Sequence, residues 1–82
     1  MAAEVQLRQV FAAVLKVDPD ALGDHSSMDT VESWDSLQHM ILMVALEEEF
    51  GITIPEDVAA ESTSFPAIRD VVDDLTREGV SR

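Results

Sequence analysis

Hydrophobic residues recur near both ends of this chain at the spacing of helices that bury one face. Apolar positions follow the order i, i+3, i+4, i+7, i+8 at Leu7, Val10, Phe11, Val14 and Leu15. They follow the order i, i+3, i+4, i+7 at Ile68, Val71, Val72 and Leu75. This period places the apolar side chains on one side of each helix. It predicts helices over about residues 4–17 and 65–78. Pro19 should end the first near Val17.

The middle of the chain predicts a further helix over about residues 36–50. Gly51 follows it and suits a helix C-terminus, where a left-handed backbone is common. Pro55 then suits the first turn of a short helix over about residues 55–60. We expect Ser64 to cap the last helix and Gly79 to end it.

A long loop over residues 18–35 separates the first two helices. Loops of this length are uncommon inside a compact domain and are often functional. Four apolar residues could pin it against the helices, namely Leu22, Met28, Val31 and Trp34. The fold class is therefore all-α: one domain over residues 1–82, a small bundle of three main helices and one short helix.

The helix over residues 36–50 is apolar on two sides. Its core side carries His39, Leu42, Met43, Leu46 and Phe50. The opposite side carries a second set, here called the apolar strip: Leu37, Met40, Ile41 and Val44. Ser36 borders the strip, and Glu47 and Glu48 close its far end. Such a helix is either fully buried or bears a binding surface. We interpret the strip as a docking surface; the alternative is that Ile41 or Val44 packs under the long loop.

Charge and composition narrow the function classes. The formal net charge is −12, from 17 acidic and 5 basic residues, so nucleic acid is an improbable partner and basic protein patches are favoured. The charge could also serve solubility alone. There is no cysteine, and the apolar run Met40–Leu46 is too short to cross a membrane. Without a secretory signal pattern at the N-terminus, we expect a cytoplasmic location.

Ser36 is the main candidate for chemistry, since it stands where the loop becomes a helix. An isolated serine there would ordinarily be an N-cap, a role that Asp35 could take instead. A hydrolase would pair Ser36 with His39, but there is no glycine-flanked nucleophile elbow. A calcium loop is only partly matched, by Asp18, Asp20, Gly23, Asp24 and Asp29. We expect no metal site. A plain interaction module remains the third alternative.

Two stretches resemble the acyl carrier protein family. They are Asp35-Ser36-Leu37 and the run Ala45-Leu46-Glu47-Glu48-Glu49-Phe50-Gly51-Ile52-Thr53-Ile54-Pro55, and the resemblance covers nearly the whole chain. It implies that Ser36 carries 4′-phosphopantetheine, which a magnesium-dependent phosphopantetheinyl transferase takes from coenzyme A. Substrates would ride on its thiol as thioesters, so the protein would be a carrier and not an enzyme.

The resemblance also implies where partners dock. The matching positions are Asp35, Leu37, Met40, Ile41, Val44, Glu47 and Glu48. The partners would be the transferase and acyl-loading and acyl-processing enzymes with basic patches, and the carrier itself a monomer.

The sequence departs from the fatty-acid type of this family. That type usually carries acids just after the serine-leucine pair, whereas this chain has Gln38, His39, Met40 and Ile41. A tryptophan before Asp35, here Trp34, likewise makes the chain more similar to stand-alone carriers of specialised pathways than to the fatty-acid type. We therefore expect a role in polyketide, antibiotic or related biosynthesis. A peptidyl or aminoacyl carrier and a fatty-acid carrier are the alternatives.

Overall fold

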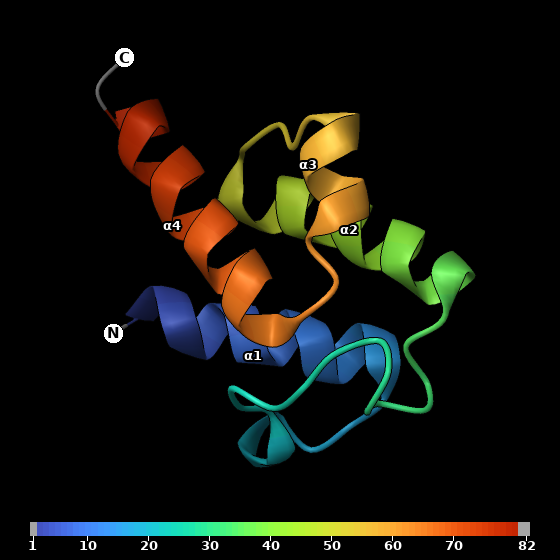
Figure 1. The fold of residues 1–82 in the computed structure, drawn as a ribbon. Helices are drawn as coiled ribbons and strands as arrows, with labels where there is room; N and C mark the ends of the chain where they lie inside the picture. The colour runs from blue at the N-terminus through green and yellow to red at the C-terminus, as the bar shows by residue number, and fades with distance from the viewer. Residues whose placement is uncertain (1, 81–82) are drawn as a thin grey trace.

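The computed structural model describes residues 2–80, and within them the chain forms four α-helices and no β-strand (Figure 1). In chain order the elements are α1 (Ala2–Leu15), the 3-10 helix η1 (Pro19–Ala21), α2 (Ser36–Phe50), α3 (Glu56–Glu61) and α4 (Phe65–Val80). The expected small all-α bundle is confirmed. α2 has the expected bounds, Pro55 precedes the first turn of α3, and α4 continues past Gly79.

The first helix ends earlier than its sequence suggests. α1 stops at Leu15 rather than near Val17, because Lys16 takes a left-handed backbone with φ of 58°. A left-handed residue breaks the helical hydrogen-bond pattern before Pro19 can do so. At the end of α2, Gly51 makes the expected left-handed cap with φ of 64°, and its N–H donates to the Glu47 carbonyl.

The core is built around three aromatic rings from distant parts of the chain. The Phe11 ring of α1 makes edge contacts with Trp34 of the long loop, at 5.4 Å between centroids, and with Phe65 of α4, at 5.0 Å. All three side chains are at most 1% exposed. Edge-to-face pairs are favourable beyond the area they bury. This cluster holds α1, the loop and α4 together.

The long loop is anchored as expected. Leu22 and Trp34 are buried, and Met28 and Val31 pack against the core. The Met28 N–H also donates to the Thr63 carbonyl at 3.0 Å, which ties the loop to the segment after α3. The loop therefore has one defined path to the start of α2 (Figure 1).

We expect substitutions at the two left-handed helix ends, Lys16 and Gly51, to change the stability of the protein in opposite directions. Gly51→Ala should lower the free energy of unfolding by about 1–2 kcal/mol, the cost of a left-handed Cβ-bearing residue, since nothing described lies within 4 Å of the added Cβ. Lys16→Gly should raise the free energy of unfolding by up to about 1 kcal/mol, because glycine adopts the left-handed backbone without the strain that lysine has there. Urea denaturation measures both changes. Destabilisation by Lys16→Gly would contradict the assigned backbone.

Candidate functional site

The first turn of α2 leaves its serine accessible. Asp35 is the N-cap: its backbone is extended, and its Oδ1 accepts the Gln38 N–H at 2.8 Å. Ser36 is then the first residue of α2, and its side chain is exposed. The capping role therefore belongs to Asp35, as one reading of the sequence allowed. The Ser36 hydroxyl is not needed to end the helix.

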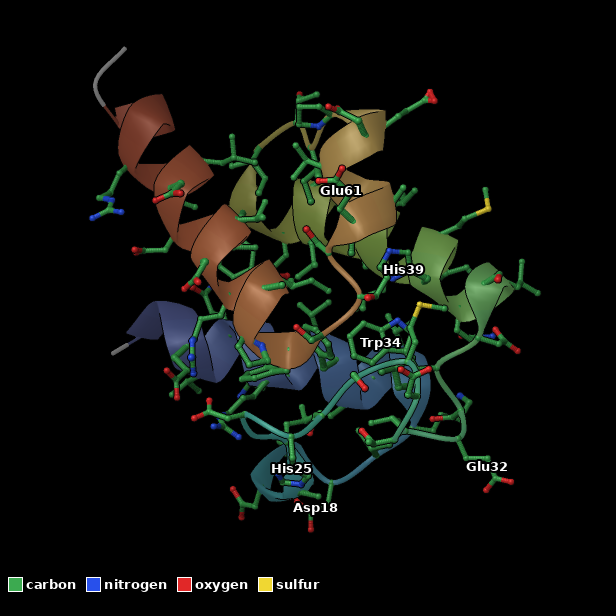
Figure 2. The ribbon with its side chains drawn as sticks, in the orientation of Figure 1. Asp18, His25, Glu32, Trp34, His39 and Glu61 are labelled. Atoms are coloured by element: carbon green, nitrogen blue, oxygen red, sulfur yellow. The ribbon has the colours of Figure 1, made fainter. Side chains whose placement is uncertain are left out.

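Both ring nitrogens of His39 are hydrogen-bonded away from Ser36. The Trp34 Nε1–H donates to His39 Nδ1 at 3.0 Å, so Nδ1 is the unprotonated nitrogen. His39 Nε2–H then donates to the Ala59 carbonyl of α3 at 2.7 Å. Trp34 and His39 lie next to one another where the loop meets α2 and α3 (Figure 2). His39 is thus buried and engaged, and the geometry does not support it as a base for Ser36.

The two sides of α2 differ in exposure as the sequence predicts. His39, Leu42, Met43 and Leu46 are buried. The residues of the apolar strip are all exposed, from 45% for Ile41 to 67% for Met40. The alternative that Ile41 or Val44 packs under the long loop is therefore wrong. Large exposed apolar side chains in one row are a feature of interaction surfaces.

Glu47 and Glu48 lie in different surroundings. Glu48 is exposed and shares a surface hollow of about 410 Å³ with the apolar strip. Glu47 is half-buried, and its Oε2 accepts the Ile54 N–H at 2.7 Å, just before α3. One of its carboxylate oxygens is therefore engaged within the chain. Asp35, also expected to dock partners, is exposed beside Ser36 but uses Oδ1 for the helix cap.

A groove beside Ser36 was not foreseen from the sequence. It has a volume of about 660 Å³, runs between α2 and α3, and has Ser36 in its lining. Its apolar lining includes Met28, Met40 and Met43. Methionine is common at surfaces that adapt to varied apolar ligands. Their clustering could not be read from the sequence, because Met28 reaches α2 only through the path of the loop.

The charges around α2 are acidic. α2 itself contains no lysine or arginine. Three arginines elsewhere pair with acids of the chain: Arg8 with Glu4, Arg69 with Asp24, and Arg77 with both Asp73 and Asp74. The face that bears the strip is therefore complementary to a basic partner.

Of the loop acids that resemble part of a calcium site, Asp18 serves the local fold. Asp18 Oδ1 accepts the Asp20 N–H at 2.9 Å and caps η1. In the described part of the chain no group of three or more His, Cys, Asp or Glu side chains could hold a metal ion. No helix within these residues is long and apolar enough to span a membrane.

Comparison with known proteins places this chain in a family. Residues 5–74 match the family described as "Phosphopantetheine attachment site". An acyl carrier protein from Campylobacter hominis is 39% identical to this chain, over 82% of this chain and 81% of the relative. An acyl carrier protein from Thermosynechococcus vestitus is 34% identical, over 83% of this chain and 80% of the relative. The solution structure of a holo acyl carrier protein from Geobacter metallireducens matches with a TM-score of 0.87 at 26% identity, over 100% of this chain and 94% of that one.

The sequence of this chain matches the family and its relatives, and its fold matches that of a solved acyl carrier protein. The protein belongs to the phosphopantetheine-binding acyl carrier protein family, whose members are carriers and not catalysts.

Proposed function

We propose that this protein carries acyl groups as thioesters on a 4′-phosphopantetheine arm attached to Ser36. The observation that carries the proposal is that Ser36, the first residue of α2, is exposed and is not needed as the N-cap. Asp35 already caps the helix. A hydroxyl in that position is reachable by a modifying enzyme. The family match over residues 5–74 includes this serine.

The residues at the start of α2 fit a phosphodiester. The first N–H groups of a helix lack intrahelical acceptors and carry partial positive charge, which favours a phosphate group. The helix is 15 residues long, so this effect is fully developed. The chain contains no cysteine, and the prosthetic group supplies the thiol that thioester chemistry needs. The role of the chain is to hold that group at Ser36 and to present it to partners.

We propose that partners dock on the apolar strip. Its exposed side chains supply apolar contact, and Glu48 supplies charge at the far end. The phosphopantetheinyl transferase and acyl-processing enzymes would meet it with apolar and basic residues. Asp35 and Glu47 stay in the proposed docking surface, although each has one oxygen engaged in the chain. A tethered substrate at a docked carrier has a high local concentration at the partner's site.

For the pathway, we propose polyketide or related specialised biosynthesis. The support is the start of α2, where Gln38, His39, Met40 and Ile41 replace the acids usual in the fatty-acid type. The docking surface therefore begins apolar. A partner that recognises it needs an apolar contact close to Ser36, with basic residues further along α2.

Ser36→Ala should abolish loading. Incubation of the unmodified protein with phosphopantetheinyl transferase, coenzyme A and Mg²⁺ should add the mass of one phosphopantetheine group, measured by intact-protein mass spectrometry. Ser33→Ala is the matched control, because Ser33 is also an exposed serine just before α2. It should load normally. A mass gain that survives Ser36→Ala would show that another residue is the attachment site.

Val44→Glu should weaken docking without unfolding the protein. Its matched control is Val5→Glu, because Val5 on α1 is also a valine that is 54% exposed. We expect Val44→Glu to reduce kcat/KM for modification by the transferase about tenfold, equivalent to about 1.4 kcal/mol of lost contact. Val5→Glu should leave it within about twofold. Equal losses in both variants would mean that overall charge, and not the strip, governs docking.

A further inference from the structure

The first turn of α2 determines where the Ser36 backbone lies. Helix ends fray, because their first N–H groups have no acceptor within the helix. Here the Asp35 carboxylate accepts the Gln38 N–H at 2.8 Å, and the Asp35 carbonyl accepts the His39 N–H, also at 2.8 Å. Both bonds depend on Asp35, which is itself exposed. An exposed cap is held only as firmly as the chain on either side of it.

Trp34 and His39 stand on either side of this turn and are joined to each other. The Trp34 Nε1–H donates to His39 Nδ1 at 3.0 Å, and the two rings stack with their centroids 5.9 Å apart (Figure 2). Trp34 is 1% exposed and His39 is 9% exposed. Residues 35–38 lie between them in sequence. The buried hydrogen bond therefore closes a short ring of chain that contains Ser36.

The two side chains are also fixed by other helices. His39 Nε2–H donates to the Ala59 carbonyl of α3 at 2.7 Å, and the indole of Trp34 makes an edge contact with Phe11 of α1. A buried polar group that makes all its hydrogen bonds is rigid and specifies one arrangement. We call Trp34 and His39 the indole–imidazole pair. It connects the exposed first turn of α2 to the buried core.

The position of this turn matters for chemistry at Ser36. In phosphoryl-type transfer the attacking and leaving oxygens lie roughly in line, and a small misplacement of the nucleophile is costly in rate. The Ser36 side chain is exposed, so packing does not hold it in place. The placement of its hydroxyl therefore depends on the backbone of the first turn.

We propose that Trp34 and His39 are positioning residues for the modification of Ser36. The hydrogen bond between their rings holds the first turn of α2 in the conformation from which the hydroxyl attacks. This rests on the proposed function, since it needs transfer of the arm to Ser36. Docking and positioning are then separate: the apolar strip binds the transferase, and the indole–imidazole pair presents the serine.

The step that they serve is a displacement at phosphorus. The Ser36 oxygen forms a bond to the phosphorus of coenzyme A that carries the pantetheine. The bond from that phosphorus to the bridging oxygen of the pyrophosphate breaks, and adenosine bisphosphate leaves with the oxygen. The proton of the Ser36 hydroxyl passes to the transferase or to water. Trp34 and His39 touch none of the reacting atoms in this step.

Two amide substitutions separate the two hydrogen bonds of His39. His39→Asn places an oxygen near the position of Nδ1, so it keeps an acceptor for Trp34 but is too short to reach Ala59. His39→Gln reaches Ala59 and leaves the indole N–H unpaired. Each variant loses one buried hydrogen bond, so the two should lose similar stability. Trp34→Phe keeps an aromatic ring in the core and removes the N–H.

The first experiment measures steady-state kinetics with a phosphopantetheinyl transferase, coenzyme A and Mg²⁺, at a temperature where circular dichroism shows every variant folded. His39→Gln and Trp34→Phe should lower kcat about tenfold and leave KM for the carrier within about twofold, because the apolar strip is unchanged. The conservative His39→Asn should restore kcat to within about threefold of the wild type. Gly51→Ala, which destabilises the other end of α2, is the control and should change neither constant.

A double variant tests whether the two residues act through one bond. Trp34→Phe and His39→Gln both remove the hydrogen bond between the rings. The kcat of the double variant should therefore be no lower than that of the worse single variant. Losses that multiply would show that the two residues act independently, which would contradict the proposal.

The second experiment uses the unmodified protein and needs no transferase. Hydrogen exchange of the Gln38 amide, followed by NMR, reports how often the first turn opens, because this amide donates to the Asp35 carboxylate. Exchange should be about tenfold faster in His39→Gln and Trp34→Phe and within about threefold of the wild type in His39→Asn. The indole N–H of Trp34 should follow the same order in the two His39 variants.

The outcomes separate the positioning role from a role in the core alone. Equal losses of kcat in His39→Asn and His39→Gln, or a rise in KM with kcat unchanged, would overturn the proposal. Unchanged Gln38 exchange in His39→Gln and Trp34→Phe would show that the pair does not hold the first turn. If wild-type Ser36 accepts no arm, the proposed function fails instead, and the exchange rates still decide whether the pair holds this turn.

Discussion

The structure depends on the burial of one indole ring next to Ser36, the proposed attachment site. Trp34 is 1% exposed, and its ring contacts Phe11 of α1 on one side and stacks on His39 of α2, with centroids 5.9 Å apart. A buried N–H is costly without an acceptor, and His39 Nδ1 provides it. Asp35 and Ser36 follow directly in the chain. The position of the indole therefore fixes where α2 begins and where its first hydroxyl lies.

That start determines which sides of α2 face the core and the solvent. Leu42 and Leu46 are completely buried, so the helix cannot rotate without exposing them. Its opposite side must then present Leu37, Met40, Ile41 and Val44 to solvent. Exposing apolar surface is unfavourable for an isolated domain. We propose that partners bind this same surface, and the net charge of −12 opposes self-association.

The sequence predicted those features that depend on local pattern. Helical period placed α2 and its two faces correctly, Ser64 caps α4 by accepting the Ala67 N–H, and Gly51 ends α2. The features that it missed depend on tertiary contacts. Nothing local indicates that Glu47 bonds to Ile54, that His39 reaches Ala59, or that Lys16 is left-handed. Trp34 and His39 were recognised separately, but only the folded loop brings the indole N–H to the imidazole.

One side of α2 holds the fold, and we propose that the other side meets partners. Methyl cross-saturation NMR, from an unlabelled phosphopantetheinyl transferase to the methyl-labelled carrier, tests it most directly. We expect strong transfer to the methyl groups of Leu37, Met40, Ile41 and Val44, and little to those of the buried Leu42 and Leu46. Transfer concentrated on α1 or α4, with none to the apolar strip, would contradict the proposal that partners dock on α2.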